Sequence, residues 1–186
     1  VVVPTGSGRS RCVEEARWQW YRKGYRSIAA QCVPDRPFGA LGDLLAELFR
    51  MTVTHGHREL AGSDAAVLQA IWPALPVEIS SGDAWPPNPR AAGEALARVF
   101  DRHAPIAIAL FDVDDADVGT AAVLPHLRAA LPKGVRLWAT SRRPMPGFRQ
   151  IRPPPWSAEG AKAVLADLLP EGAELQGALG RTPLES

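Results

Sequence analysis

The chain has little of what several binding classes require. Its 186 residues include only two cysteines, Cys12 and Cys32, and neither belongs to a metal-ligand pattern, which disfavours a disulfide scaffold and a cysteine zinc site. The 21 basic and 20 acidic residues leave a net charge of +1. This balance excludes a bulk electrostatic field for nucleic acid or an anionic membrane. Any binding must therefore come from a local site.

Long apolar runs are also absent. No stretch reaches the ~18 apolar residues that a membrane span needs, and no charged segment precedes an apolar run at the start, as in a signal peptide. Together with the low cysteine content, this predicts a cytoplasmic protein. The first residue is Val1 rather than Met and lies inside a predicted strand, so we expect a piece of a longer chain.

What is present is an alternation of strand and helix patterns, in a length that suits one domain or slightly more. The apolar run over 106–111 is typical of a central parallel strand, and leucines at i, i+3, i+4, i+7 spacing predict a helix over 40–51. Ser63 is the expected N-cap of a short helix. The alternation predicts a parallel α/β sheet that binds ligands at its carboxyl edge. The predicted strands are 1–3, 25–33, 106–111, 135–140 and 150–152, and the predicted helices are 10–23, 40–51, 63–72, 89–103, 118–131 and 157–169.

The start of the chain, residues 1–11, has the layout of a phosphate-binding loop. It reads as a strand, a glycine-rich turn and a helix that bears a hydroxyl. In the usual G-x-x-x-x-G-K-[ST] loop, backbone N–H groups cradle phosphates, the lysine reaches the β/γ-phosphates and the hydroxyl holds Mg²⁺. Here Val3 replaces the first glycine and Arg9 replaces the lysine, whereas the second glycine and Ser10 remain. A flexible turn or a linker has a similar composition, so that alternative stays open at this point.

Two later strand exits carry chemistry that complements this loop. The acidic segment 112–117 follows the strand 106–111, and the polar segment 140–142 ends the strand 135–140. Phosphoryl transfer needs Mg²⁺ held by a hydroxyl and a carboxylate, a cation on the phosphates and a residue that orients water. Taken singly, the acids also fit a solvated loop and the arginines a surface cluster. The candidates for these roles are Ser10, Asp112, Arg9 and Arg142.

In these motifs the chain resembles the nucleotide-binding module of STAND-class ATPases, AAA-related signalling ATPases of large bacterial regulators and kinases. Residues 4–15 are similar to the family's G-E-x-G-x-G-K-S-R-L-L-E-E start, and residues 110–117 to its acidic L-D-D-L-H-W-A-D strand. The segment 32–41 is similar to the family's second-strand region, and 140–142 to its sensor strand. Residues 180–185 resemble the G-G-N-P-L-x-x-E turn that opens a helical lid.

The resemblance implies a P-loop NTPase-like parallel β-sheet sandwiched by helices, with the start of a helical lid at the C-terminus. It implies a nucleotide-binding α/β domain over 1–156 and helices leading to the lid over 157–186. ATP or ADP is the implied cofactor, with Mg²⁺. The implied nucleotide-binding residues are Thr5, Gly6, Ser7, Gly8, Arg9, Ser10, Arg11 and Pro183, the metal ligands are Ser10 and Asp112, and the catalytic residues are Asp112 and Arg142, with Arg142 sensing the γ-phosphate.

The departures from the family pattern concern the same site. When the family motif is aligned on Ala116-Asp117, Phe111 takes the metal-associated position and Asp112 the catalytic one. When the alignment is shifted by one residue, Asp112 becomes the metal-linked acid and Val113 stands where the catalytic acid should be. Arg9 keeps a positive charge, but its planar fork differs from a compact ammonium. Val3 restricts the backbone at the base of the loop. We therefore predict a degenerate module of a larger signalling protein, a conformational switch with weak or no hydrolysis.

The same residues are compatible with other functions. The alternative of another class is a nucleotide-free pseudo-ATPase scaffold that binds proteins, and a small kinase or GTPase is disfavoured because N-K-x-D and the loop lysine are absent. The expected partners are other domains of the same polypeptide or separate proteins, with self-association open, and neither nucleic acid nor membrane. Trp18 and Trp20 beside basic residues fit nucleic-acid binding, but an amphipathic helix explains them equally. His55 and His57 resemble a metal pair without a third ligand.

Overall fold

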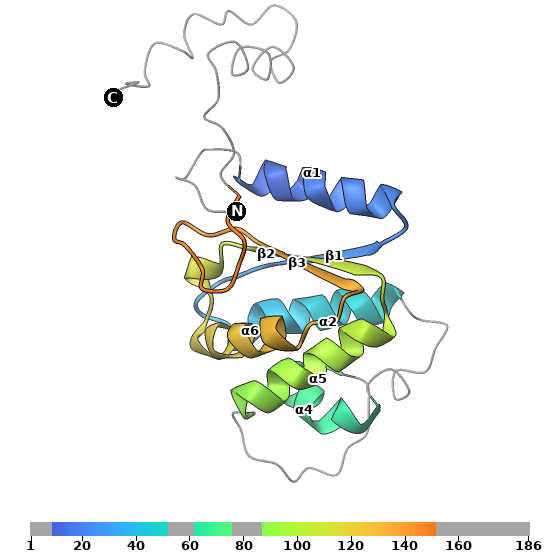
Figure 1. Ribbon diagram of the computed structural model, residues 1–186. Coiled ribbons are helices and arrows are strands. Elements are labelled where there is room, and N and C mark those ends of the chain that lie inside the picture. Colours follow the sequence, from blue (N-terminus) through green and yellow to red (C-terminus); the bar gives the residue numbers. More distant parts are fainter. Residues whose placement is uncertain (1–8, 52–61, 76–86, 152–186) are drawn as a thin grey trace, which may run out of the picture. The chain divides into compact units, whose positions relative to one another are not determined.

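A parallel β-sheet with helices on both faces forms the described part of the chain, residues 9–51, 62–75 and 87–151 of a computed structural model (Figure 1). The prediction of an α/β fold with a parallel sheet is confirmed at that level. The chain divides into two units, Val1–Pro153 and Pro154–Ser186, and every described residue belongs to the first.

The elements follow one another as the alternation predicted. Three strands pair in the order β1-β2-β3, and both pairings are parallel. The strands are β1 (Arg26–Gln31), β2 (Ile106–Phe111) and β3 (Val135–Ala139). The helices are α1 (Arg9–Arg22), α2 (Gly39–Met51), α4 (Ala65–Ile71), α5 (Pro89–Arg102) and α6 (Val118–Ala130), with short 3-10 helices η1 (Gly62–Asp64) and η2 (Val113–Asp115).

The central strand β2 separates two unlike faces. Ile106, Ile108 and Leu110 belong to the main core, which α2, α5 and α6 cover. Ala107 and Ala109 are equally buried but point to the opposite face, because side chains alternate along a strand. That face is covered by α1, which contacts β1 and β2. The small alanine side chains let this helix lie close to the sheet.

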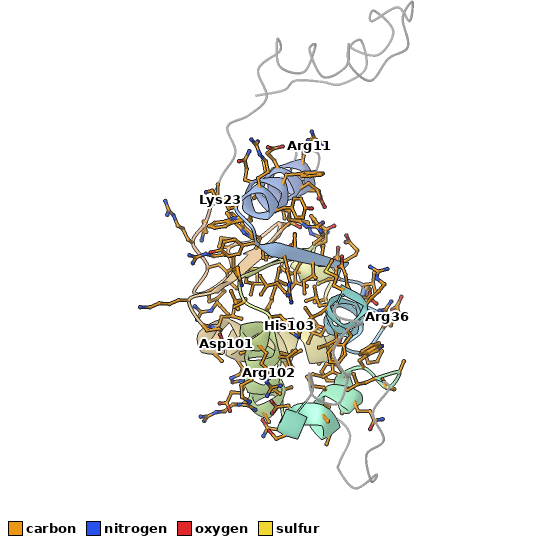
Figure 2. All side chains as sticks on the ribbon, turned by 90° about the vertical axis from the view of Figure 1, so that its right-hand side faces the viewer. Arg11, Lys23, Arg36, Asp101, Arg102 and His103 are labelled. Carbon is orange, nitrogen blue, oxygen red and sulfur yellow. The ribbon has the colours of Figure 1, made fainter. Side chains whose placement is uncertain are left out.

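The two helical layers are visible in both views. In Figure 1, α1 lies on one side of the sheet, and α2, α5 and α6 lie on the other. Figure 2, turned by 90°, shows Arg11 and Lys23 on α1 at one side and Asp101, Arg102 and His103 at the end of α5 on the other. In the described segments, no helix is long and apolar enough to cross a membrane.

Two local predictions were wrong. Ser63 does not cap a helix, because the chain first forms η1 and α4 begins after Asp64, which makes no side-chain cap bond. The Asp64 carboxylate instead accepts from Arg98 Nη2 at 2.7 Å, an ion pair with α5. Gln150 and Ile151 are not in a strand. Three predictions lie outside the described residues: the last residue of that strand, the strand over 1–3 and the helix over 157–169.

The contact between α5 and α6 depends on a glycine. A Cβ atom on Gly93 would lie 2.5 Å from the backbone nitrogen of Leu127 and 2.7 Å from His126 Cβ. The first is a backbone atom of α6 and the second is a Cβ atom fixed to that backbone, so neither can rotate away. Gly42 in α2 differs, because a Cβ there would lie 3.5 Å from the Ile71 carbonyl oxygen, an ordinary contact.

We expect Gly93→Ala to destabilise the fold by about 1–3 kcal/mol, the usual range for overpacking, because α5 and α6 must separate. Gly42→Ala is the matched control and should be neutral or stabilising by up to about 1 kcal/mol, since alanine favours a helix more than glycine does. Urea unfolding of both variants measures the two effects. Equal effects of the two substitutions would contradict this packing.

Candidate functional site

The candidate site lies at the carboxyl edge of the sheet. All three strands end there, and α1, α2 and α6 begin there (Figure 1). The amino end of a helix carries unpaired N–H groups and a partial positive charge, which favour anions. The edge therefore combines three helix starts with the polar residues that follow the strands.

Asp112 ties the three strand exits together. It follows β2 with φ of 50°, a left-handed conformation that Asp tolerates better than most residues. Gln31 Nε2, at the end of β1, donates to its Oδ2 at 2.9 Å. The Asp112 N–H donates to Thr140 Oγ1 at 2.7 Å, and this hydroxyl lies 3.4 Å from Asp112 Oδ1. One carboxylate thus links β1, β2 and β3.

The next acids hold the exit of β3. Ser141 Oγ donates to Asp114 Oδ1 at 3.1 Å, and the Arg142 N–H donates to the other oxygen of Asp114. The Arg142 guanidinium forms an ion pair with Asp115, and its Nε lies 3.7 Å from Asp114 Oδ2. The structure brings the predicted residues Asp112 and Arg142 to the same edge. The carboxylates that bind Arg142, however, are those of Asp114 and Asp115 in η2.

Asp117, the last acid of the segment, has a structural role. Its side chain is buried, and Oδ1 accepts the N–H of Thr120 at 2.9 Å as the N-cap of α6. The same oxygen accepts the N–H of Phe38 at 2.9 Å, which anchors the loop before α2. The Phe38 ring covers α6 so closely that a Cβ atom on Gly119 would lie 2.6 Å from it. Asp117 therefore fixes two helix starts at the edge.

The predicted phosphate-loop residues are described only in part. Arg9 and Ser10 open α1, and Ser10 and Arg11 are exposed. Thr5, Gly6, Ser7, Gly8 and Pro183 lie outside the described residues, as do His55 and His57.

The described residues supply a small part of a metal site. Across 9–51, 62–75 and 87–151, no group of three or more His, Cys, Asp and Glu side chains is arranged to hold a metal ion. Mg²⁺ is commonly bound by one or two carboxylates, with waters and substrate phosphates completing its shell. Asp112 and Ser10 would suffice for such a site only together with the phosphates of a nucleotide.

Sequence reasoning missed Gln31 and Thr140 as the partners of Asp112. The sequence does carry a signal for both, because Gln31 ends β1 and Thr140 directly follows β3, and both strands pair with β2. It also missed the loop anchor Phe38, whose φ of 52° is rare for an aromatic residue and follows from the hydrogen bond to Asp117.

Cys32 lies against the same acids. Its side chain is buried directly after β1. Burial raises the pKa of the Cys32 thiol to about 12, and the carboxylates of Asp117, Asp112 and Asp115 add to the effect. The thiol is therefore protonated and unreactive at neutral pH, because the thiolate is the nucleophile. Cys12, also a free cysteine, is exposed on α1.

We expect the stability of the fold to fall as the pH rises from 9.0, the ordinary thiol pKa, towards about 12. The folded state holds the Cys32 proton more tightly than the unfolded state does, so its contribution is complete below the lower value and is lost above it. The limiting slope for one group is about 1.4 kcal/mol per pH unit. Urea unfolding at pH 8 and above pH 10 measures the loss, which Cys32→Ala should lack and Cys12→Ala should keep. The same loss in both variants would contradict the assignment.

Comparison with known proteins identifies no relative. No protein-family model matches the chain, and neither a curated protein nor a solved structure matches it. The resemblance to signalling ATPases therefore stays a prediction.

Proposed function

We propose that the chain is a degenerate nucleotide-binding module of P-loop type that regulates a larger signalling protein. ATP or ADP would bind at the carboxyl edge and act as a conformational switch, with weak or no hydrolysis. The observation that supports this best is that Asp112, Arg142 and the start of α1 lie together at the carboxyl edge of the sheet.

The position of α1 supports a place for the strand predicted over 1–3. The chain passes from β1 to β2 to β3 through helices on one face, whereas α1 lies on the other face (Figure 1). Connections between parallel strands are right-handed in about 98 % of cases. A parallel strand before α1 is therefore expected on the β3 side of β1, and β2 and β3 already fill the nearer positions. It would pair with β3, beside Thr140 and Arg142.

Such a pairing would create the usual kind of ligand site. The strand order would reverse at β3, and open α/β sheets bind ligands at the carboxyl side of such a reversal. The predicted loop over 4–10 would enter α1 at this point, with phosphates on its N–H groups. Arg9 would supply a cation to the phosphates, and Ser10 and Asp112 would hold Mg²⁺. Pro183 would report the nucleotide state to the lid.

Arg142 would act as the sensor of the terminal phosphate. Its guanidinium now pairs with Asp115 and lies near Asp114. A bound phosphate offers a competing anion with bidentate geometry. Movement of this side chain from the carboxylates to the phosphate would free the acidic turn η2, which is the local change that a switch requires.

The alternative is a nucleotide-free scaffold that binds proteins. One observation favours it, because donors within the chain already satisfy the acids of the edge. Gln31 and the Thr140 hydroxyl engage Asp112, and Ser141 and Arg142 engage Asp114. Nucleotide binding distinguishes the two functions.

We expect calorimetric titration of the 186-residue chain with ATP or ADP, with and without Mg²⁺, to show binding that Gly8→Asp abolishes, because an added carboxylate repels phosphate. Arg142→Gln should weaken ATP binding about tenfold and ADP binding less, since a charge-assisted bond to the terminal phosphate is lost. Arg143→Gln, at the next exposed arginine, is the control and should bind as the parent does. Phosphate release assays test hydrolysis separately.

The absence of both binding heat and a thermal shift at millimolar nucleotide would overturn the nucleotide switch and leave the scaffold. Binding that survives in Gly8→Asp would place the nucleotide elsewhere and contradict the proposed site.

A further inference from the structure

A groove crosses the outer edge of β1, between α1 on one face of the sheet and α2 on the other. Trp18 and Tyr21 line it from α1, together with the ion pair of Glu14 and Arg17. Ser27 lines it from β1, and Glu47 and Met51 line it from α2. Its volume is about 400 Å³, within the range of small-ligand pockets. The groove is distinct from the proposed nucleotide site, because none of the residues proposed to bind phosphate or metal lines it.

The groove exposes two aromatic rings that pack on each other. Trp18 is 61 % and Tyr21 62 % exposed, and their ring centroids lie 5.8 Å apart with perpendicular planes. Large aromatic side chains exposed together mark interaction sites more often than isolated ones do. The faces of such rings carry negative potential, which attracts a cation placed over them.

Glu47 adds a negative charge that no cation of the described residues neutralises. Its Oε2 accepts the N–H of Ala29 at 2.9 Å, and no Lys, Arg or His of the described segments lies within ion-pair distance of its carboxylate. Glu14, which also lines the groove, differs because Arg17 neutralises it at 3.0 Å. Arg17 is further held by Ser27 Oγ, to which its Nε donates at 3.0 Å. The uncompensated charge of the groove is therefore negative.

The other flank of α1 shows what the groove lacks. There the ring of Trp20 has Lys23 Nζ at 4.9 Å and Arg136 Cζ at 5.3 Å from its centroid. The chain thus supplies its own cations to the tryptophan on that side. In the part of the chain that the structure describes, no such cation contacts Trp18 or Tyr21.

We propose that this groove, which we call the β1-edge groove, binds a basic side chain, Arg or Lys, of a partner protein. The cation would lie against Trp18 and Tyr21 and pair with the Glu47 carboxylate, which combines cation–π attraction with a charge-assisted hydrogen bond. Arg suits the site better than Lys, because its planar guanidinium both stacks on rings and bonds a carboxylate with two N–H groups.

The occupant is a polypeptide segment because the groove continues along a strand edge. The N–H groups of Arg26 and Cys32 donate to carbonyls of Pro105 and Phe111, so the alternate main-chain groups of β1 face outward. A second hollow, of about 480 Å³, follows this edge along Ala29 and Gln31, and Glu47 lines both. An extended segment lying there would use the outward main-chain groups other than the Ala29 N–H, which Glu47 already accepts, as well as the cation site.

The test uses the whole chain and a pair of matched peptides, acetyl-Thr-Val-Arg-Val-Thr-amide and the same peptide with citrulline, the neutral isostere of arginine. The readout is the indole N–H signal of Trp18 in nitrogen-15 NMR, assigned with Trp18→Phe. We expect saturable shifts with the arginine peptide and at least tenfold weaker binding of the citrulline peptide, because the charge is lost. Glu47→Gln, which keeps an oxygen for the Ala29 N–H, should cause the same loss.

Glu15→Gln is the control for general electrostatics, since Glu15 is exposed on α1 and, among the described residues, accepts a side-chain hydrogen bond from Gln19 alone, at 3.1 Å. It should bind the arginine peptide as the parent does. Equal binding of both peptides, or equal losses in Glu15→Gln and Glu47→Gln, would overturn the cation site. Acetyl-arginine-amide binding as tightly as the peptide would overturn the polypeptide occupant in favour of a small cation. Trp18 shifts that follow protein concentration alone would identify a second copy of this chain and also overturn the proposal.

Discussion

The burial of β2 on both faces is the constraint on which the rest of the described structure depends. Its side chains from Ile106 to Leu110 are fully buried, and both other described strands pair with it. Large residues on one face require the layer of α2, α5 and α6, whereas alanines on the other admit α1 at close range. A strand without polar side chains in its interior also leaves its chemistry to the exit, where the chain meets water again. The acids of 112–117 are therefore where function is to be sought.

At that exit, charge and conformation depend on each other. Asp112 takes a left-handed backbone conformation and joins the ends of β1 and β3 through Gln31 and Thr140. Asp117 turns inward and fixes the starts of α2 and α6. Between them, η2 presents the carboxylates that hold Arg142. The edge is thus organised by hydrogen bonds to protein donors, and a nucleotide would have to compete for one of them. This is why we favour a switch over an efficient hydrolase.

The sequence predicts most of the elements and less of the site. The limits of β2 are those of an uninterrupted apolar run, and α2 follows the leucine spacing, because burial imposes both patterns directly. Ser63 is not the cap because it lies within η1 and α4 begins after Asp64, whose carboxylate bonds Arg98, a partner distant in sequence that no local pattern reveals. The pairing of Arg142 with η2 rather than with Asp112 depends on how β3 lies against β2. The β1-edge groove joins residues of three elements, and the place of Glu47 in it is recognisable only once the fold brings α2 to the edge of β1.

The measurement that tests the central claim most directly is hydrogen–deuterium exchange of the chain with and without ATP and Mg²⁺. Nucleotide at the carboxyl edge should slow amide exchange in segment 140–143, where Arg142 would bind the phosphate, and should speed exchange in the acidic turn η2, which Arg142 would release. The opposite end of the sheet, around 132–136, should be unchanged. Unaltered exchange throughout the chain at millimolar nucleotide, or protection confined to segments away from this edge, would contradict the account.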